Sequence, residues 1–390
     1  MGLSARPRVL WISESPGCFT GFGTVGRELL RRLQGKNKYE ISAVCWEDAC
    51  GKSDQHGIFM CRPRHGQSFA DLVRETIGRV RPEIIITFGD PWSFQWLLRE
   101  PTRRDRCWVQ YVTIDAEPAS REWLPALTNA DAVVATSAYG AQVLRRDLRL
   151  ENTAVIPLGV NCQEFKKLAE PNRLRSAHHL DNRFVVGFIG RNQPRKQIPV
   201  LIKAFAAFRA RHPEPFLYLH TIPKDRLGWD LQALLERYGL LNDTGVTPNL
   251  SLDRGLSPEA LNELYNLFDV FVLPSNGEGF GLTILEAMAA GVPVLTTECA
   301  ATEELVRSRA MTFAVKAWVT CAPFNLELPI PDEQDLAAKM DNLYRDQELR
   351  EHLAYTGNVF VQGLTWEKCA DRWETLLDSM DPAAKVRTLG

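Results

Sequence analysis

Two glutamates, Glu278 and Glu286, flank a glycine-rich turn, and their spacing indicates a ligand site. The apolar run 270–274 just before them is typical of a buried strand, and an apolar helix with Glu286 in its first turn is expected to follow. The backbone amides of the intervening residues, Gly279, Phe280, Gly281, Leu282 and Thr283, should then lie at a helix N-terminus, where anions bind. Two carboxylates beside an anion site suit a ligand that carries both hydroxyls and phosphates.

A purely structural interpretation of the same residues stays open. Thr283 followed three residues later by Glu286 fits a capping box, with Thr283 as N-cap and Glu286 at N3. Residues elsewhere in the chain must decide between the two interpretations.

A second set of polar residues follows the predicted strand 184–189. Arg191 can grip a phosphate with two parallel hydrogen bonds, and Lys196 adds a compact point charge. Two cations and helix amides can neutralise the charge that develops on a departing diphosphate without a metal ion. The chain therefore contains a predicted phosphate clamp.

A glycine loop in the first half offers a different chemistry. Gly21-Phe22-Gly23-Thr-Val-Gly26 matches the dinucleotide fingerprint, and the ribose-binding acid would be Glu47 or Asp48. This alternative is an NAD(P)-dependent oxidoreductase. Against it, residues 14–20 separate the strand from the first glycine, whereas the fingerprint turns directly off the strand. A long glycine loop could instead bring its backbone amides to a phosphate. A purely structural alternative is that the glycines only allow the helix and the strand to pack closely.

Together these motifs resemble those of retaining GT-B glycosyltransferases of family 4. The resemblance spans nearly the whole chain and rests on the glycine loop, Val155–Asn161, Arg191 with Lys196, Asp269–Ser275, the two glutamates and Gly291–Val294. It implies two doubly wound Rossmann-like α/β domains facing across a cleft.

The resemblance also implies roles for single residues. Glu286 would bind the nucleotide ribose, and Glu278 would hold the donor sugar. Arg191 and Lys196 would clamp the diphosphate with the amides of Gly23, Leu282 and Thr283. Gly21 and Phe22 would also belong to the nucleotide-binding site. The segment at Asp253 and Arg254 would frame the base. The implied enzyme is a hexosyltransferase that retains anomeric configuration, without a protein nucleophile, and that needs no cofactor or metal.

This chain departs from the family pattern at three places. Asp115, with Glu117 nearby, stands where many members have a histidine that faces the sugar, so we expect Asp115 to be catalytic together with Glu278, Arg191 and Lys196. Asn161 replaces the commoner aspartate. His220 replaces part of a glycine-rich loop and is either a phosphate contact or a packed core residue.

Composition bounds the protein class. With 390 residues, 45% hydrophobic and 24% charged, the chain is typical of a globular protein of two domains. It lacks a signal-peptide pattern and any apolar run of roughly 18 residues. The nine scattered cysteines indicate reduced thiols and a cytoplasmic protein rather than a zinc site.

The order of predicted elements supports two domains. Strands and helices alternate over residues 1–165 and again over 180–364, which predicts parallel sheets with helices on both faces. The polar stretch 161–183 separates them. Residues 365–390 are expected to form a helix that returns to the first domain.

The partners follow from the same expectations. The donor would be a UDP- or GDP-linked sugar, and the acceptor a glycan, a lipid-linked sugar, a small molecule or an anionic polymer. Residues 91–106 combine aromatic residues with arginines, which suits contact with such an acceptor or peripheral contact with the inner face of a membrane. A buried helix with a basic end is the alternative. A non-catalytic sugar-nucleotide-binding relative also stays open, and the sequence indicates no oligomeric state.

Overall fold

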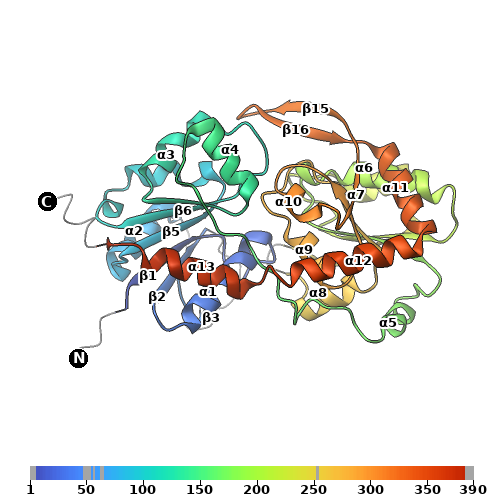
Figure 1. Ribbon diagram of the computed structural model, residues 1–390, viewed down its shortest axis with the longest axis horizontal. Helices are drawn as coiled ribbons and strands as arrows, with labels where there is room; N and C mark the ends of the chain where they lie inside the picture. The colour runs from blue at the N-terminus through green and yellow to red at the C-terminus, as the bar shows by residue number, and fades with distance from the viewer. Residues whose placement is uncertain (1–5, 47–53, 56–57, 62–65, 252–253, 383–390) are drawn as a thin grey trace. The chain divides into compact units, whose positions relative to one another are not determined.

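The computed structural model describes residues 6–46, 54–55, 58–61, 66–251 and 254–382. Their contacts divide the chain into two units (Figure 1). Unit 1 contains residues up to Ile114, then Pro118–Leu158, and the C-terminal segment from Trp366. Unit 2 contains Gly159–Thr365 and the short segment Asp115–Glu117.

Unit 1 is built on an eight-stranded sheet that is parallel except at β3. Its strand order is β3-β4-β2-β1-β5-β6-β7-β8. Continuous apolar runs form the central strands because helices cover both faces of the sheet. The strands are β1 (Arg8–Ser13), β2 (Glu40–Cys45), β3 (Asp54–Gln55), β4 (Ile58–Cys61), β5 (Ile84–Gly89), β6 (Cys107–Val112), β7 (Ala132–Ala135) and β8 (Ala154–Val155).

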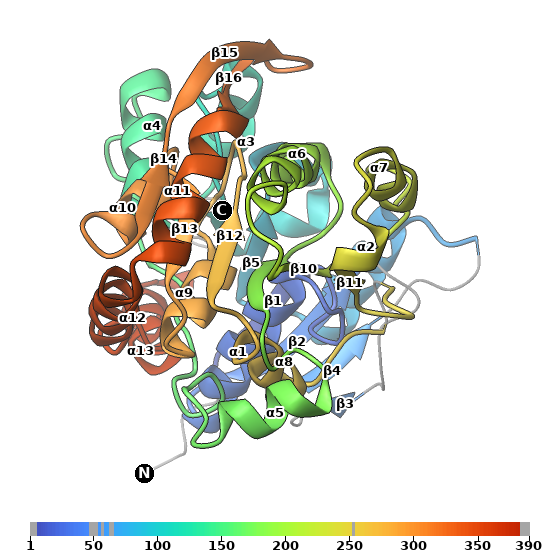
Figure 2. The ribbon, with the colours of Figure 1, turned by 90° about the vertical axis from the view of Figure 1, so that its right-hand side faces the viewer.

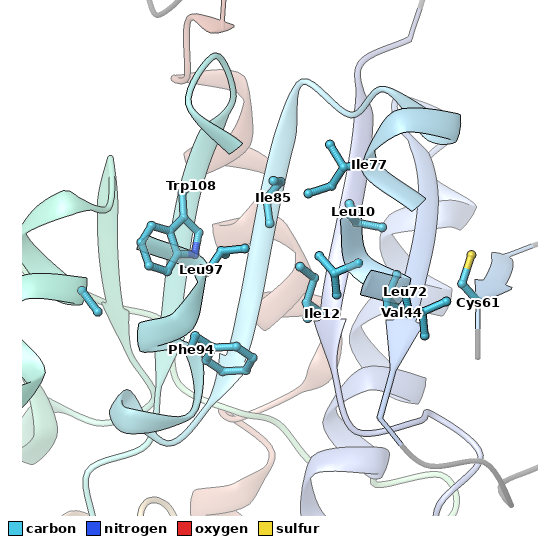
Figure 3. Close-up of a cluster of buried hydrophobic side chains, with 12 residues drawn as sticks. Leu10, Ile12, Val44, Cys61, Leu72, Ile77, Ile85, Phe94, Leu97 and Trp108 are labelled. Atoms are coloured by element: carbon cyan, nitrogen blue, oxygen red, sulfur yellow. The ribbon is translucent and has the colours of Figure 1, made fainter. Parts of the chain in front are cut away.

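One face of this sheet carries a hydrophobic cluster from strands and helices far apart in sequence. Figure 3 shows Leu10, Ile85 and Trp108 on neighbouring strands, with Phe94 and Leu97 packed over them. The helical segments of unit 1 are α1 (Gly21–Gly35), α2 (Phe69–Val80), η1 (Pro91–Arg99), η2 (Pro101–Arg103), η3 (Arg121–Trp123), α3 (Leu124–Asn129), α4 (Ala138–Leu148) and α13 (Trp366–Asp378).

The last helix, α13, packs on α1 inside unit 1. Its buried Trp373 meets Tyr111 edge-on, with ring centroids 5.0 Å apart. Ion pairs continue the contact at the surface, including Arg32 with Glu367 at 2.8 Å and Lys36 with Asp371 at 2.6 Å. The C-terminal segment therefore returns to the first α/β unit.

Unit 2 has an all-parallel six-stranded sheet with the order β11-β10-β9-β12-β13-β14. β9 and β12, which precede the two predicted ligand motifs, are neighbours in it. The strands are β9 (Phe184–Ile189), β10 (Pro215–His220), β11 (Thr244–Val246), β12 (Val270–Leu273), β13 (Val294–Thr297) and β14 (Met311–Phe313).

Helices cover both faces of this second sheet. Figure 2 shows α6 and α7 on one side of β12, with α9 and α12 on the other. The helical segments of unit 2 are α5 (Pro171–Ala177), η4 (Pro194–Lys196), α6 (Ile198–Arg209), α7 (Leu231–Arg237), η5 (Leu241–Asp243), α8 (Pro258–Tyr265), α9 (Leu282–Ala289), α10 (Thr302–Val306), α11 (Glu333–Arg345) and α12 (Gln347–Val361).

Several local expectations differ from the structure. The polar stretch 161–183 contains the helix α5, whose first residue is Pro171. An antiparallel hairpin of β15 (Val315–Cys321) and β16 (Leu326–Pro331), absent from the predicted elements, lies between β14 and α11. Of the described cysteines seven are free thiols, whereas Cys18 is disulfide-bonded, contrary to the expectation of reduced thiols throughout. The predicted fold class, two parallel-sheet α/β domains, is confirmed.

Candidate functional site

The two predicted ligand motifs of unit 2 meet at one edge of its sheet. Residues 190–196 follow β9, and residues 274–281 follow β12. Because β9 and β12 are parallel neighbours, both loops leave the sheet at its carboxyl edge, where ligands of open α/β sheets bind.

Glu278 lies buried between two cations. The Nζ of Lys196 is 2.5 Å from its Oε1, and Nη1 of Arg195 is 3.2 Å from its Oε2. Arg195 also donates to the Gly277 carbonyl at 3.0 Å. Burial alone would raise the pKa of Glu278, but Lys196 and Arg195 outweigh burial and hold that pKa at about 2. Glu278 is therefore an anion at neutral pH.

The same burial lowers the pKa of the Lys196 ammonium to about 8, although Glu278 and Asp115 favour its charged form. Lys196 therefore loses its charge just above neutral pH.

Asp115 joins this cluster through the segment Asp115–Glu117 of unit 2. A Cβ atom added to Gly277 would lie 2.6 Å from the Asp115 carbonyl oxygen, so the two backbones touch. Burial raises the pKa of the Asp115 carboxyl, Glu278 raises it further, and Arg195 and Lys196 lower it. The structure thus brings together three of the four residues expected to be catalytic: Asp115, Lys196 and Glu278.

Arg191, the fourth, is held by a different carboxylate. Its Nε lies 3.0 Å from Oδ2 of Asp225, and about a third of its side chain is exposed. Buried Asn192 fixes the loop that carries Asp225, because its amide donates to the carbonyls of Ile222 and Trp229. The sequence indicated Arg191 but missed Arg195, Asn192 and Asp225. Their roles depend on contacts made after folding, and only the adjacency of Arg195 to Lys196 was a signal.

The helix after the turn begins earlier than the capping-box interpretation requires. Gly281 is the N-cap of α9, with φ of 104°, a left-handed conformation that favours glycine. Thr283 is therefore the second helical residue, and Glu286 lies in the second turn. The capping-box alternative is therefore wrong, because the N-cap is Gly281 and not Thr283. Leu282 and Thr283, as the first helical residues, have no intrahelical acceptor for their amides.

Glu286 is positioned by a buried tyrosine that sequence reasoning missed. The hydroxyl of Tyr265, at the end of α8, donates to Oε2 of Glu286 at 2.8 Å and lies 3.2 Å from the Thr283 carbonyl. Burial raises the pKa of Tyr265, so its hydroxyl stays protonated and remains a donor. Of the turn residues, Phe280 is buried and Gly279 partly buried.

In unit 1 the glycine loop is shorter than expected. α1 already begins at Gly21, and the Thr20 side chain accepts from the Gly23 amide at 3.1 Å. A Cβ atom on Gly23 would lie 2.3 Å from the Cys18 carbonyl oxygen. Phe22 packs edge-on against Phe88 at 5.0 Å between ring centroids. Gly21–Gly23 are thus helical, and the Gly23 amide is bonded within the chain.

The remaining site candidates have separate environments. Arg254 is exposed and forms an isolated bridge with Ser251, whereas Asp253 lies outside the described residues, as do Glu47 and Asp48. His220 bonds Thr247 through Nδ1 at 3.0 Å, and burial lowers its pKa to about 4. It is therefore neutral at pH 7 and brings no positive charge to a phosphate.

The stretch 91–106 is partly buried, and Arg99, Pro101, Arg104 and Asp105 are exposed. Phe94 and Leu97 lie in the core, and the Arg103 guanidinium stacks over Trp108 at 4.8 Å. Arg106 is ion-paired with Asp105. In the described part of the chain, no helix is long and apolar enough to cross a membrane. Among the described residues, no group of three or more His, Cys, Asp or Glu side chains could hold a metal ion.

Comparisons with known proteins agree with this geometry. Residues 171–360 match the family model described as glycosyl transferases group 1. A D-inositol 3-phosphate glycosyltransferase of Stackebrandtia nassauensis is 30% identical over 63% of this chain and 53% of its own length. One from Corynebacterium jeikeium is 27% identical over 73% and 62%. The chain thus spans about half to three fifths of the length of these two relatives.

Solved structures show the same fold. Sucrose-phosphate synthase from Thermosynechococcus elongatus aligns with a TM-score of 0.76 at 21% identity, over 96% of this chain and 98% of its own. Anabaena HepE in complex with UDP-glucose aligns with a TM-score of 0.76 at 19% identity, over 96% and 100%. The expected GT-B fold is confirmed.

Proposed function

Residues 171–360 belong to the glycosyl transferases group 1 family, and on that premise we propose that the whole protein is a glycosyltransferase. It moves a sugar from a nucleotide-diphosphate donor to an acceptor hydroxyl. The observation that carries this proposal is the cluster of Lys196, Arg195 and Glu278 at the carboxyl edge of the unit 2 sheet.

The donor occupies this edge in an extended fashion. Glu286, oriented by Tyr265, accepts hydrogen bonds from the ribose hydroxyls. The amides of Leu282 and Thr283, at the positive end of α9, meet the diphosphate. Glu278 and Asp115 face the donor sugar. The sugar hydroxyls donate hydrogen bonds to these two buried carboxyl groups.

Charge neutralisation at the diphosphate comes from side chains. Lys196 and Arg191 supply cations that stabilise the negative charge developing on the leaving group. Arg191 is only partly buried, so it can exchange Asp225 for a phosphate oxygen. We propose that transfer needs no metal and retains anomeric configuration. The acceptor attacks the face from which the diphosphate departs, so no protein nucleophile is required.

The donor base and the acceptor are proposed from relatives. Anabaena HepE is described with UDP and with UDP-glucose, and the Stackebrandtia relative is named for inositol 3-phosphate. A UDP-linked hexose is therefore our first donor, with GDP-mannose second. The first acceptors to test are hydroxylic small molecules that carry a phosphate.

A thermal-shift screen tests the proposal. UDP-glucose, UDP-N-acetylglucosamine, GDP-mannose, NAD⁺ and NADP⁺ are each added at equal concentration, and the melting temperature is compared. We expect a nucleotide sugar to raise it and both dinucleotides to leave it unchanged. A rise with NAD(P) alone would favour the oxidoreductase alternative. Nucleotide-sugar binding without transfer to any of a broad acceptor panel would favour a non-catalytic relative.

A further inference from the structure

The β15–β16 hairpin stands outside the main sheet of unit 2, where its two strands pair only with each other as a ladder (Figure 1). Most of β15 is exposed, and Trp318 is 59% exposed. An isolated two-stranded hairpin is marginally stable in water. Contacts beyond the ladder must therefore help to hold β16 in place.

One such contact joins β16 to the segment that carries Asp115. The Glu327 amide donates to the Glu117 carbonyl at 2.7 Å in an antiparallel bridge. In an antiparallel ladder alternate residues direct their amides to the same edge, so positions 327, 329 and 331 face away from β15. Positions 329 and 331 are prolines, which have no N–H. Within β16, Glu327 is thus the donor available on this edge.

The neighbouring residue Leu328 reaches the turn before Glu278. A Cβ atom on Gly277 would lie 3.4 Å from Cδ2 of Leu328 and 2.6 Å from the Asp115 carbonyl oxygen. The space that a side chain at position 277 would take is thus filled by Asp115 and Leu328. The hairpin, the Asp115–Glu117 segment and the Gly277–Glu278 turn form one contiguous contact.

We propose that Glu327 and Leu328 are positioning residues for Asp115. The Glu327 amide fixes the segment at Glu117, and Leu328 presses on the Gly277 turn, so the Asp115 carboxyl is held beside Glu278. The inference rests on the proposed function, because Asp115 matters there as a group facing the donor sugar.

The charges around Asp115 explain why it must be held. Its carboxyl interacts with Arg195, Lys196 and Glu278, and Cys299 also lies within its electrostatic reach. Burial and the Glu278 charge both disfavour the Asp115 anion in this position. Without an anchor the segment would relax toward water. A backbone bond and an apolar contact can resist this without adding another charge to the site.

Proline substitution can test the anchor while leaving the hairpin intact. Glu327→Pro removes the amide that donates to the Glu117 carbonyl. Its position lies on the same edge of β16 as positions 329 and 331, which are already prolines. Thr320→Pro is the matched control, since Thr320 pairs with Glu327 across the ladder and its amide faces the outer edge of β15. Both variants lose the hydrogen bond between the Thr320 hydroxyl and Glu327, so only the anchor distinguishes them.

Two measurements are compared in the full-length protein. Hydrogen exchange followed by mass spectrometry reports the order of residues 113–119 without reference to activity. Steady-state assays give kcat and KM for the nucleotide sugar that the wild type turns over. Each variant is also combined with Asp115→Asn. Leu328→Ala, with Leu328→Met as its conservative partner, provides a second route if Glu327→Pro fails to fold.

We expect faster exchange in residues 113–119 and a kcat at least ~10-fold lower for Glu327→Pro, with KM changed less. Thr320→Pro should match the wild type in both. In the Asp115→Asn background, Glu327→Pro should lower kcat little further, because both changes remove the function of the same positioned carboxyl. Equal exchange in the two proline variants, or additive losses in kcat, would overturn the inference. A wild type that turns over no nucleotide sugar would instead overturn the proposed function. The hydrogen-exchange comparison does not depend on activity, so the two failures can be distinguished.

Discussion

The Lys196 ammonium and the Glu278 carboxylate form a buried ion pair whose two atoms lie 2.5 Å apart. Removing one partner from such a pair leaves an uncompensated buried charge. The pair therefore places a cation for the diphosphate next to a carboxylate for the donor sugar. A change in the protonation of Lys196 should change the affinity for the donor.

Donor affinity should fall in alkaline solution. The pKa of Lys196 is lowered to about 8, chiefly by burial, so the free protein loses this charge above pH 8. A bound diphosphate favours the charged form, hence the donor Kd should rise with pH from about 8 upward. Titration calorimetry with UDP between pH 6.5 and 9.5 measures this. Lys196→Arg, which stays charged, should remove the dependence, and an equal alkaline rise in that variant would contradict the assignment.

Tyr265→Phe should weaken donor binding while the fold survives. The substitution deletes the hydroxyl that donates to Glu286 at 2.8 Å, and it keeps the ring in the core. A lost hydrogen bond to a charged group costs about 1.5 kcal/mol, roughly a tenfold rise in Kd. Fluorescence titration with UDP and with inorganic pyrophosphate separates the cause. If Glu286 binds ribose, UDP affinity falls and pyrophosphate affinity does not, whereas equal losses would point to general damage.

His220 should make the protein less stable in acid. Burial lowers its pKa from 6.5 to about 4, so between these values the unfolded chain binds more protons than the folded one. Its contribution is present above pH 6.5 and is lost as pH falls to 4, by up to roughly 3 kcal/mol. Urea unfolding of the wild type and of His220→Asn at pH 7 and pH 4.5 tests this. The difference between the two proteins should depend on pH, and a constant difference would argue against it.

Gly23 and Gly21 should respond oppositely to alanine. At Gly23 a Cβ atom would lie 2.3 Å from the Cys18 carbonyl and 2.9 Å from that of Ser15, whereas at Gly21 nothing lies within 4 Å. Gly23→Ala should cost about 2 kcal/mol of unfolding free energy through overpacking. Gly21→Ala should be neutral or slightly stabilising, since alanine favours helices. Equal stabilities in chemical denaturation would show that packing does not require Gly23.

Local patterns predicted the elements that depend on short-range sequence. The strand 184–189 is found with the predicted bounds, because a continuous apolar run defines it. Parallel strand order then brings the loops after β9 and β12 together. The proximity of Lys196 to Glu278 follows from that order.

Other features depend on contacts that no local pattern encodes. The start of α9 was misplaced because the left-handed Gly281 overrides the Thr-x-x-Glu signal. Arg195 was overlooked beside Lys196, since only the folded turn shows that its guanidinium reaches Glu278. Tyr265 reaches Glu286 from another helix, and β16 reaches Glu117 from far along the chain. The cytoplasmic location and the acceptor remain predictions.

The most direct measurement of the central claim is the affinity of UDP for the wild type and for Lys196→Met at pH 7. The wild type should bind, and the variant should lose a charge-assisted phosphate bond of about 1.5–3 kcal/mol, a rise in Kd of roughly 10- to 150-fold. Circular dichroism checks that the variant keeps its fold. Equal UDP affinity in the two folded proteins would contradict the assignment of this edge of unit 2 as the donor site.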